Sequence, residues 1–152
     1  MSEPMQPGQV GMSQWGPLAA WGDRVVASLI DYLPVLVLNL LVINRGFLGY
    51  LVGLAGTVYG FYVAYMNGER GASPGKRITG LKVVRETDGQ TIGGGMGIIR
   101  AIAHVIDSVI CLIGYLFPLW DPKRQTLADK IIGTLVLRDQ PKEPFSIEAF
   151  KL

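Results

Sequence analysis

Two charged residues, Arg24 and Asp31, lie at the start of an apolar stretch that is long enough to cross a lipid bilayer. The stretch covers residues 25–43, and a membrane-spanning helix needs about 20 mainly apolar residues. An ionised aspartate near the middle of such a helix costs about 2.5–3.5 kcal/mol on insertion scales. Asp31 therefore either takes part in function or has a partner that neutralises its charge.

The composition favours one small membrane domain. Of 152 residues, 49% are hydrophobic and 17% are charged, whereas soluble domains have about 25% charged residues. The net charge of +2 is too small to indicate a nucleic-acid partner. Because the basic residues cluster beside the apolar runs, the expected partner is an anionic lipid bilayer. The first 23 residues contain no Lys or Arg and no apolar core, so we expect a retained helix instead of a cleaved signal.

Three apolar runs predict an all-α membrane protein with three apolar helices, at about residues 25–43, 47–66 and 98–120. The first two runs are predicted spans, and the second contains no charged residue. Its glycines recur at intervals of three or four residues, which is typical of a face on which another helix packs closely. These glycines are Gly49, Gly53, Gly56 and Gly60.

The third run leaves two topologies open, because it contains Arg100, His104 and Asp107. If it crosses the membrane, the basic residues after it lie on the opposite side from those of the polar connection at 67–97. That arrangement conflicts with the tendency of Lys and Arg to stay on the cytoplasmic side. The alternative is a re-entrant segment that bends at Gly114 and returns. We expect three apolar helices, the third either spanning or re-entrant, with the N-terminus inside.

Polar segments flank the predicted membrane domain at 23–138. Residues 1–22 read as a disordered N-terminal tail and residues 139–152 as a polar C-terminal tail. Within the cytoplasmic connection, residues 78–85 are strand formers, and Thr87, Asp88 and Gly89 form a turn signal. The sequence therefore predicts a short β-hairpin that leads to residues 91–92.

A short repeat places the charges of the first and third runs in the same pattern. Residues 24–31 (RVVASLID) align without a gap on residues 100–107 (RAIAHVID), with both charged positions identical. We expect the two copies to meet, with Asp31 and Asp107 at similar depth. Two close carboxylates in a low dielectric would share a proton or a cation. The alternative is that Arg and Asp only fix the helix packing through buried hydrogen bonds.

Several segments resemble the RDD family of bacterial membrane proteins over about residues 20–138. They are Arg24 with Asp31, residues 71–84, Arg100 with Asp107, and residues 125–136. The resemblance implies that Arg24 and Asp31 are the first two charges of the family name, and that the third is Asp107 or Asp129. Family members often have a histidine before the last aspartate, where this chain has Ala128.

The resemblance implies a multi-pass protein of the bacterial cell (inner) membrane that transports an unknown ligand or exchanges cations and protons. The alternative is a non-catalytic membrane adaptor or assembly factor. In either case the expected partners are the bilayer and a second copy or another membrane protein. We expect no cofactor, metal site or enzyme activity, because His104 is the single histidine and Cys111 has no base beside it. The candidate ligand, ion or proton residues are Arg24, Asp31, Arg100, His104, Asp107 and Asp129.

Overall fold

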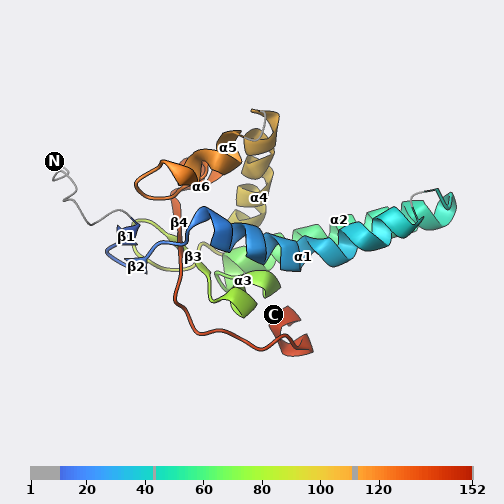
Figure 1. The fold of residues 1–152 in the computed structure, drawn as a ribbon, viewed down its shortest axis with the longest axis horizontal. Helices are drawn as coiled ribbons and strands as arrows, with labels where there is room; N and C mark the ends of the chain where they lie inside the picture. Colours follow the sequence, from blue (N-terminus) through green and yellow to red (C-terminus); the bar gives the residue numbers. More distant parts are fainter. Residues whose placement is uncertain (1–10, 43, 111–112, 152) are drawn as a thin grey trace.

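Two long helices form a hairpin that projects from a part of mixed helix and strand (Figure 1). The computed structural model describes residues 11–42, 44–110 and 113–151. Helix α1 covers Trp21–Val42 and helix α2 covers Phe47–Glu69, with mean hydropathies of 2.2 and 1.5 over their most apolar windows. At about 1.5 Å per residue, each is over 30 Å long, which matches the hydrocarbon thickness of a bilayer. The prediction of two apolar helices of spanning length is confirmed.

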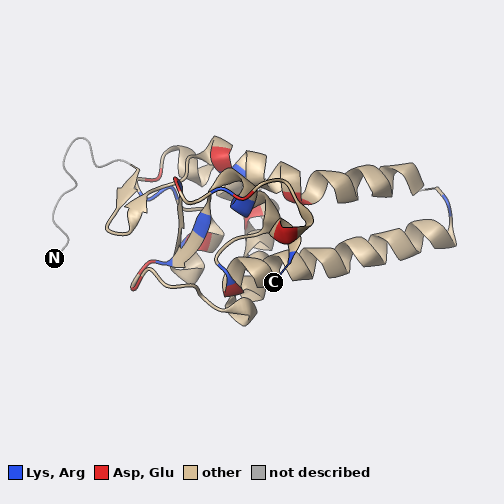
Figure 2. Ribbon diagram, turned by 90° about the horizontal axis from the view of Figure 1, so that it is seen from below, with Lys and Arg blue, Asp and Glu red and all other residues tan. Residues whose placement is uncertain are grey.

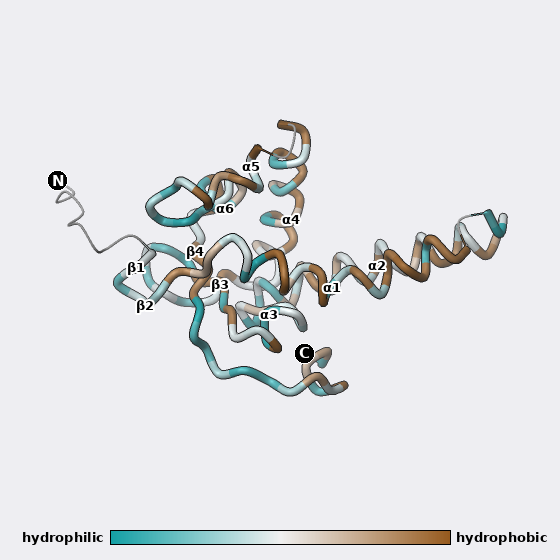
Figure 3. The backbone as a smooth tube through the Cα atoms, in the orientation of Figure 1, coloured by the Kyte–Doolittle hydropathy of each residue, from teal (hydrophilic) through white to brown (hydrophobic). Residues whose placement is uncertain are grey.

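Apolar residues recur along the two helices of the hairpin (Figure 3). Large apolar side chains on both helices are exposed, including Leu41 at 69% and Phe47 at 76%. The charged residues instead gather at the end of the molecule that holds the strands (Figure 2). A soluble protein rarely exposes an apolar patch of this extent, whereas lipid would cover it.

The third apolar run is divided instead of forming one helix over residues 98–120. Helix α4 covers Gly94–Val109, and it is followed by α5 at Ile113–Leu116 and the 3-10 helix η1 at Phe117–Leu119. The two parts are inclined to each other by 107°. Residues 111–112, and with them Cys111, lie outside the described residues. Gly114 packs against Asp107, since a Cβ there would lie 2.2 Å from its Oδ1.

Two short helices, each followed by a strand, come after the second and the third apolar segment. Helix α3 (Pro74–Thr79) precedes strand β3 (Lys82–Arg85), and helix α6 (Leu127–Ile132) precedes strand β4 (Thr134–Leu137). The two strands pair antiparallel, with Val83 opposite Val136. Both valines are fully buried, so this pair of strands lies in the core of the polar part.

The predicted hairpin after residue 78 is corrected in two respects. Residues 78–79 belong to α3, because the Ser73 side chain caps its first turn and Gly80, at φ 74°, ends it. The predicted turn exists, with Gly89 at φ 69° donating its backbone N–H to the Arg85 carbonyl. However, β3 pairs with β4 and not with residues 91–92. The all-α prediction is accordingly replaced by a mostly helical fold with two small antiparallel sheets.

The segments before α1 and after β4 also contact the polar part. Strands β1 (Met12–Ser13) and β2 (Gly16–Pro17) form a small hairpin, after which Leu18 and Ala19 are fully buried. The C-terminal segment ends in the 3-10 helix η2 (Ile147–Phe150), where Arg77 donates to the Ala149 carbonyl at 2.9 Å. Residues 11–20, which the sequence analysis assigns to the N-terminal tail, thus contact the polar part. The rest of that predicted tail, residues 1–10, lies outside the described residues.

Glycines allow the helices to approach each other closely. Helices α2 and α4 cross at Gly68 and Gly97, where a Cβ on Gly97 would lie 2.3 Å from the Ala64 carbonyl oxygen. The predicted glycine face of α2 is used in part, because a Cβ on Gly56 would lie 2.9 Å from Val35 of α1. The Gly68–Gly97 crossing fixes α4 against the base of the hairpin, where the polar residues lie.

Candidate functional site

Asp129 ties together arginines from two different helices. Its carboxylate accepts from Arg24 of α1 at 2.5 Å, and from Arg100 of α4 through Nε at 2.9 Å and Nη2 at 2.5 Å. Thr134 Oγ1 donates to the same carboxylate at 2.9 Å. Asp129 is fully buried, and it also completes the capping box that Thr126 begins at the start of α6. One carboxylate thus links α1, α4, α6 and β4.

Asp31 and Asp107 have partners of another kind. Asp31 of α1 accepts the backbone N–H of Gly75 at 2.7 Å, and Asp107 of α4 accepts that of Ala128 at 3.3 Å. Gly75 and Ala128 hold the same position, the second residue of α3 and α6. Asp107 also bonds His104 Nδ1 at 2.6 Å. Asp31 therefore holds the short helix α3, and Asp107 holds the short helix α6.

These matching contacts extend the repeat beyond the eight residues of the sequence echo. Ser73 and Thr126 both cap a six-residue helix, and Gly80 and Gly133 both end it at a φ near 73°. The strands that follow pair with each other around the equivalent residues Val83 and Val136. The two halves of the polar part are thus related by an approximate two-fold axis through β3 and β4.

The repeat differs in charge at one position. The third residue of α6 is Asp129, whereas the third residue of α3 is Lys76. Lys76 is partly buried, and its ammonium group forms no hydrogen bond or ion pair with any described residue. Burial and the nearby Arg100 lower the pKa of Lys76 to about 8, although Asp31 acts in the opposite direction. A lysine in this state can change its charge near neutral pH.

A cavity of about 570 Å³ lies at the base of the helix hairpin. It is lined by residues of α1, α2, α3 and α4, including the charged residues Arg24, Asp31, Lys76 and Arg100. His104 and Tyr115 also line it, with their rings stacked at a centroid distance of 5.5 Å. The cavity therefore combines polar groups with the apolar and aromatic surface that small-molecule sites usually provide.

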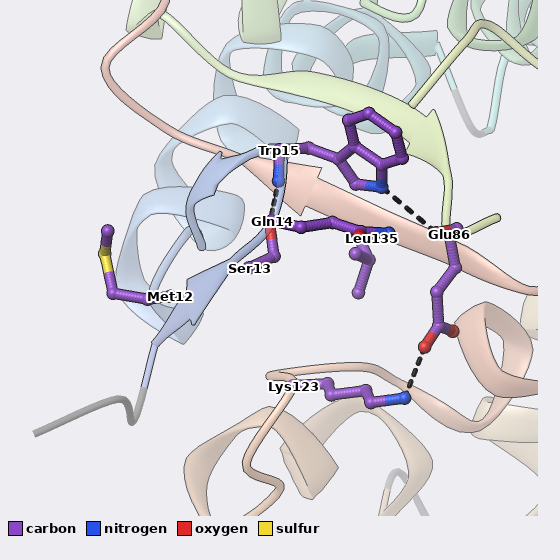
Figure 4. Close-up of a pocket in the computed structure, with 7 residues that line it drawn as sticks. All are labelled: Met12, Ser13, Gln14, Trp15, Glu86, Lys123 and Leu135. Atoms are coloured by element: carbon purple, nitrogen blue, oxygen red, sulfur yellow. Dashed lines mark hydrogen bonds and ion pairs between the residues drawn. The ribbon is translucent and has the colours of Figure 1, made fainter. Parts of the chain in front are cut away.

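A second hollow, of about 470 Å³, lies beside the β1–β2 hairpin (Figure 4). Trp15 donates its indole N–H to the Glu86 carbonyl at 3.0 Å, and the Glu86 carboxylate pairs with Lys123. Gln125 donates to the same carboxylate at 3.1 Å. Because these groups satisfy one another, this hollow is a weaker candidate than the cavity at the hairpin base.

The structure divides the six predicted site residues into two sets. Arg24, Arg100 and Asp129 form the network. Asp31 and Asp107 bind different short helices instead of each other, and His104 bonds Asp107. Among the described residues, no group of His, Cys, Asp and Glu is arranged to hold a metal ion. Lys76 was not among the predicted site residues. The sequence contains a signal for it, because Ser73 and Thr126 are each followed by a glycine seven residues later, and this shared pattern aligns Lys76 with Asp129.

The fold and the site define a small helical membrane protein in which a buried aspartate joins arginines of two helices. The chain belongs to the RDD family, whose family model matches residues 18–133. The resemblance left Asp107 and Asp129 as alternatives for the third charge of the family name. Of these two, Asp129 forms an ion pair with Arg24.

Curated relatives come from mycobacteria. The chain is 39% identical over 148 residues to a protein named proline-rich antigen homolog in two strains of Mycobacterium tuberculosis, covering 76% of this chain and 61% of the relative. It is 56% identical over 73 residues to the proline-rich antigen of Mycobacterium leprae, covering 48% of this chain and 29% of the relative. The chain thus spans about three fifths of the length of the M. tuberculosis relatives. No solved structure matches.

Proposed function

We propose that this protein is a transporter of the bacterial cell membrane that binds a small solute or ion in the cavity at the base of the α1–α2 hairpin. The observation that carries the proposal is the cavity itself, which collects four charged side chains at the point where two spanning-length helices meet the polar part. Charged groups are costly within a membrane and mark ligand or ion pathways there.

The strand pairing supports a re-entrant third segment. Strand β3 precedes α4 and strand β4 follows α6, yet the two are hydrogen-bonded neighbours. The intervening chain must then start and end on one side of the membrane. Ala19 also donates its backbone N–H to the Val136 carbonyl at 2.8 Å, which supports a position of the start of α1 on that same side. In the proposed topology the α1–α2 hairpin crosses the membrane, and the α1–α2 connection lies on the opposite side.

The distribution of basic residues supports a cytoplasmic position for the polar part. Arg45 is the single basic residue in the connection between α1 and α2. The positive-inside tendency therefore favours the polar part as the cytoplasmic end. Its basic residues include Arg70, Lys76, Arg77, Lys82, Arg85, Lys123, Arg124, Lys130 and Arg138.

Within this proposal the charged residues have two roles. Asp129 is saturated by two arginines and Thr134, so it holds the helices together and does not exchange its proton. Asp31 and Lys76 line the cavity without forming an ion pair with each other. A solute that neutralises the charge of Asp31 or Lys76 changes the net charge of the cavity. Coupled transport requires such a link between solute binding and charge.

Transport is tested in vesicles that contain the purified protein. An imposed gradient of Na⁺ or K⁺ should produce a change of internal pH, read with a trapped dye, if the protein exchanges cations and protons. Asp31→Asn should abolish the change. Asp139→Asn is the matched control, because Asp139 is exposed at φ 59°, a conformation that asparagine tolerates. Normal exchange by the Asp31 variant would contradict a role for this carboxylate.

A second candidate function is a membrane adaptor. The saturated Arg24–Asp129–Arg100 network favours it, because such a network is built for fixed packing. Its partner would be a second copy or another membrane protein that packs on the lipid-facing helices. Vesicles that show no flux of any tested ion, together with a stable partner recovered by cross-linking in membranes, would favour the adaptor over the transporter.

A further inference from the structure

We propose that the cavity at the hairpin base binds an anionic phosphate group, carried by a membrane lipid or by a soluble phosphate compound. The inference rests on the cavity of the proposed function and names the class of ligand that it takes. It is carried by the excess of positive over negative side chains among the residues that line the cavity.

The lining contains more positive than negative charge. Arg24, Lys76 and Arg100 contribute three cations, whereas Asp31 is the one carboxylate in the lining among the described residues. Asp129 lies behind the two arginines and is already saturated. The Asp31 carboxylate has the Gly75 backbone N–H as a partner. An anion in the cavity would therefore meet cations that the surrounding carboxylates leave partly uncompensated.

The three cations also have N–H groups that lack an acceptor. Arg24 Nε is buried and has no hydrogen-bond partner. Arg100, with its side chain 7% exposed, uses Nε and Nη2 on Asp129 and leaves Nη1 without an acceptor among the described residues. Lys76 Nζ is the third such donor. Of these three donors, Arg24 Nε is the buried one, and a buried donor without a partner is costly. Arg100 and Lys76 line the cavity, where a ligand with several acceptor oxygens would satisfy Arg100 Nη1 and Lys76 Nζ.

Phosphate fits this set of donors better than a neutral polar group does. It offers several charged oxygens, and arginine and lysine are the residues that most often bind it in proteins. A metal cation would find a single carboxylate in the lining, that of Asp31, so cation exchange would depend on Asp31, whereas an anion can use all three cations. The cavity thus has the charge and the donors of an anion site.

The rim of the cavity favours a lipid as the source of the phosphate. Leu29 and Tyr32 line the cavity and are 52% and 45% exposed. On α1 they continue into the exposed apolar residues Leu33 and Leu36. A lipid could place its headgroup against the cations while its acyl chains remain along α1. A soluble phosphate compound would use the same cations without this apolar surface.

The charge of Lys76 makes binding dependent on pH. The pKa of Lys76 is lowered to about 8, so the ammonium form is present at pH 7 and is lost as the pH rises through this value. The charged groups that face it are Arg24 and Asp31 of α1, Arg100 of α4 and Asp129 of α6. Tyr32, His104 and Tyr115 line the same cavity. Affinity for an anion should therefore fall between pH 7 and pH 9.5.

The test measures binding to the purified full chain. One arm uses nanodiscs of phosphatidylcholine with increasing phosphatidylglycerol, and native mass spectrometry counts retained anionic lipid. The other arm titrates glycerol phosphate against protein in detergent by calorimetry. We expect Lys76→Gln to weaken binding about tenfold at pH 7, as expected for a lost charge-assisted hydrogen bond. Lys142→Gln is the control, because Lys142 is exposed.

Each outcome has a distinct meaning. Retained phosphatidylglycerol without binding of glycerol phosphate supports the lipid, and saturable binding of glycerol phosphate supports a soluble ligand. Binding that is absent in both arms, or that neither Lys76→Gln nor a pH of 9.5 weakens, overturns the inference. The pH series uses the unaltered protein, so it stands even if the variant folds poorly.

The binding test and the transport test can fail independently. A chain that exchanges cations in vesicles but binds no phosphate would contradict this inference alone. A chain that binds phosphate without any flux would contradict only the proposed transport.

Discussion

At the scale of single residues, Asp129 shows why a charge can be kept in the interior of this protein. Burial alone would raise the pKa of the Asp129 carboxyl, but the Arg100 and Arg24 guanidinium groups hold it well below the usual range. The carboxylate therefore stays ionised at neutral pH. A buried ion pair adds little stability compared with a well-packed apolar core, but removal of one partner leaves the others unpaired.

Asp129→Asn should strongly destabilise the protein. The substitution removes the negative charge but leaves Arg24 and Arg100 buried, with side chains 11% and 7% exposed. Breaking such a network typically costs about 3–5 kcal/mol. Urea unfolding in detergent, followed by circular dichroism, would measure the loss. Asp88→Asn, at an exposed carboxylate, should change the free energy of unfolding by less than about 0.5 kcal/mol. Equal stability of the two variants would show that the network is dispensable.

At the scale of secondary-structure elements, the closest helix contact depends on glycine. Helices α2 and α4 approach at Gly68 and Gly97 until the backbone of one lies against the backbone of the other. The Gly93 N–H also donates to the Gly68 carbonyl at 2.9 Å. This contact sets the position of α4, and through Arg100 it sets the geometry of the network and the cavity.

Gly97→Ala should therefore separate α2 from α4. The added Cβ would lie 2.3 Å from the Ala64 carbonyl oxygen, so the backbone must move, at a cost of about 1–3 kcal/mol. Gly95→Ala is the control, because a Cβ there has nothing within 4 Å and alanine favours the helix by up to about 1 kcal/mol. Thermal unfolding in detergent should lower the Tm of the first variant and leave that of the second unchanged or higher. An unchanged Tm for Gly97→Ala would mean that the crossing is adaptable.

The same scale explains what the sequence could and could not predict. Helices α1 and α2 follow from apolar length, which is a local property, and both were predicted. The pairing of β3 with β4 depends on chain segments far apart in sequence, so the local turn at Gly89 suggested the wrong partner. The network was not predicted either, because the repeat drew attention to a meeting of Asp31 with Asp107, whereas the structure pairs Arg24 with Asp129.

At the scale of the whole molecule, the approximate two-fold axis gives the polar part a simple plan. Each half contains a long helix with an inward aspartate, a short capped helix that this aspartate holds, and a strand on the axis. In the first half an additional helix, α2, lies between the long helix α1 and the short helix α3. The apolar segment of this half is therefore a hairpin of two helices. In the second half α4 is followed by the short α5, at 107° to it. The same order of elements thus contains a hairpin of spanning length in the first half and a shorter, bent segment in the second half.

This plan predicts the sides of the membrane on which three exposed positions lie. In a Cys111→Ser background, single cysteines introduced as Arg45→Cys, Asp88→Cys and Asp139→Cys would be labelled in intact cells with a reagent that does not cross the membrane. Because β3 and β4 are paired, positions 88 and 139 should both be protected, while position 45 should react. Permeabilised cells provide the control, since all three should react there. Reaction at position 139 in intact cells, with position 88 still protected, would mean that the third segment crosses the membrane, and the β3–β4 pairing would then be wrong.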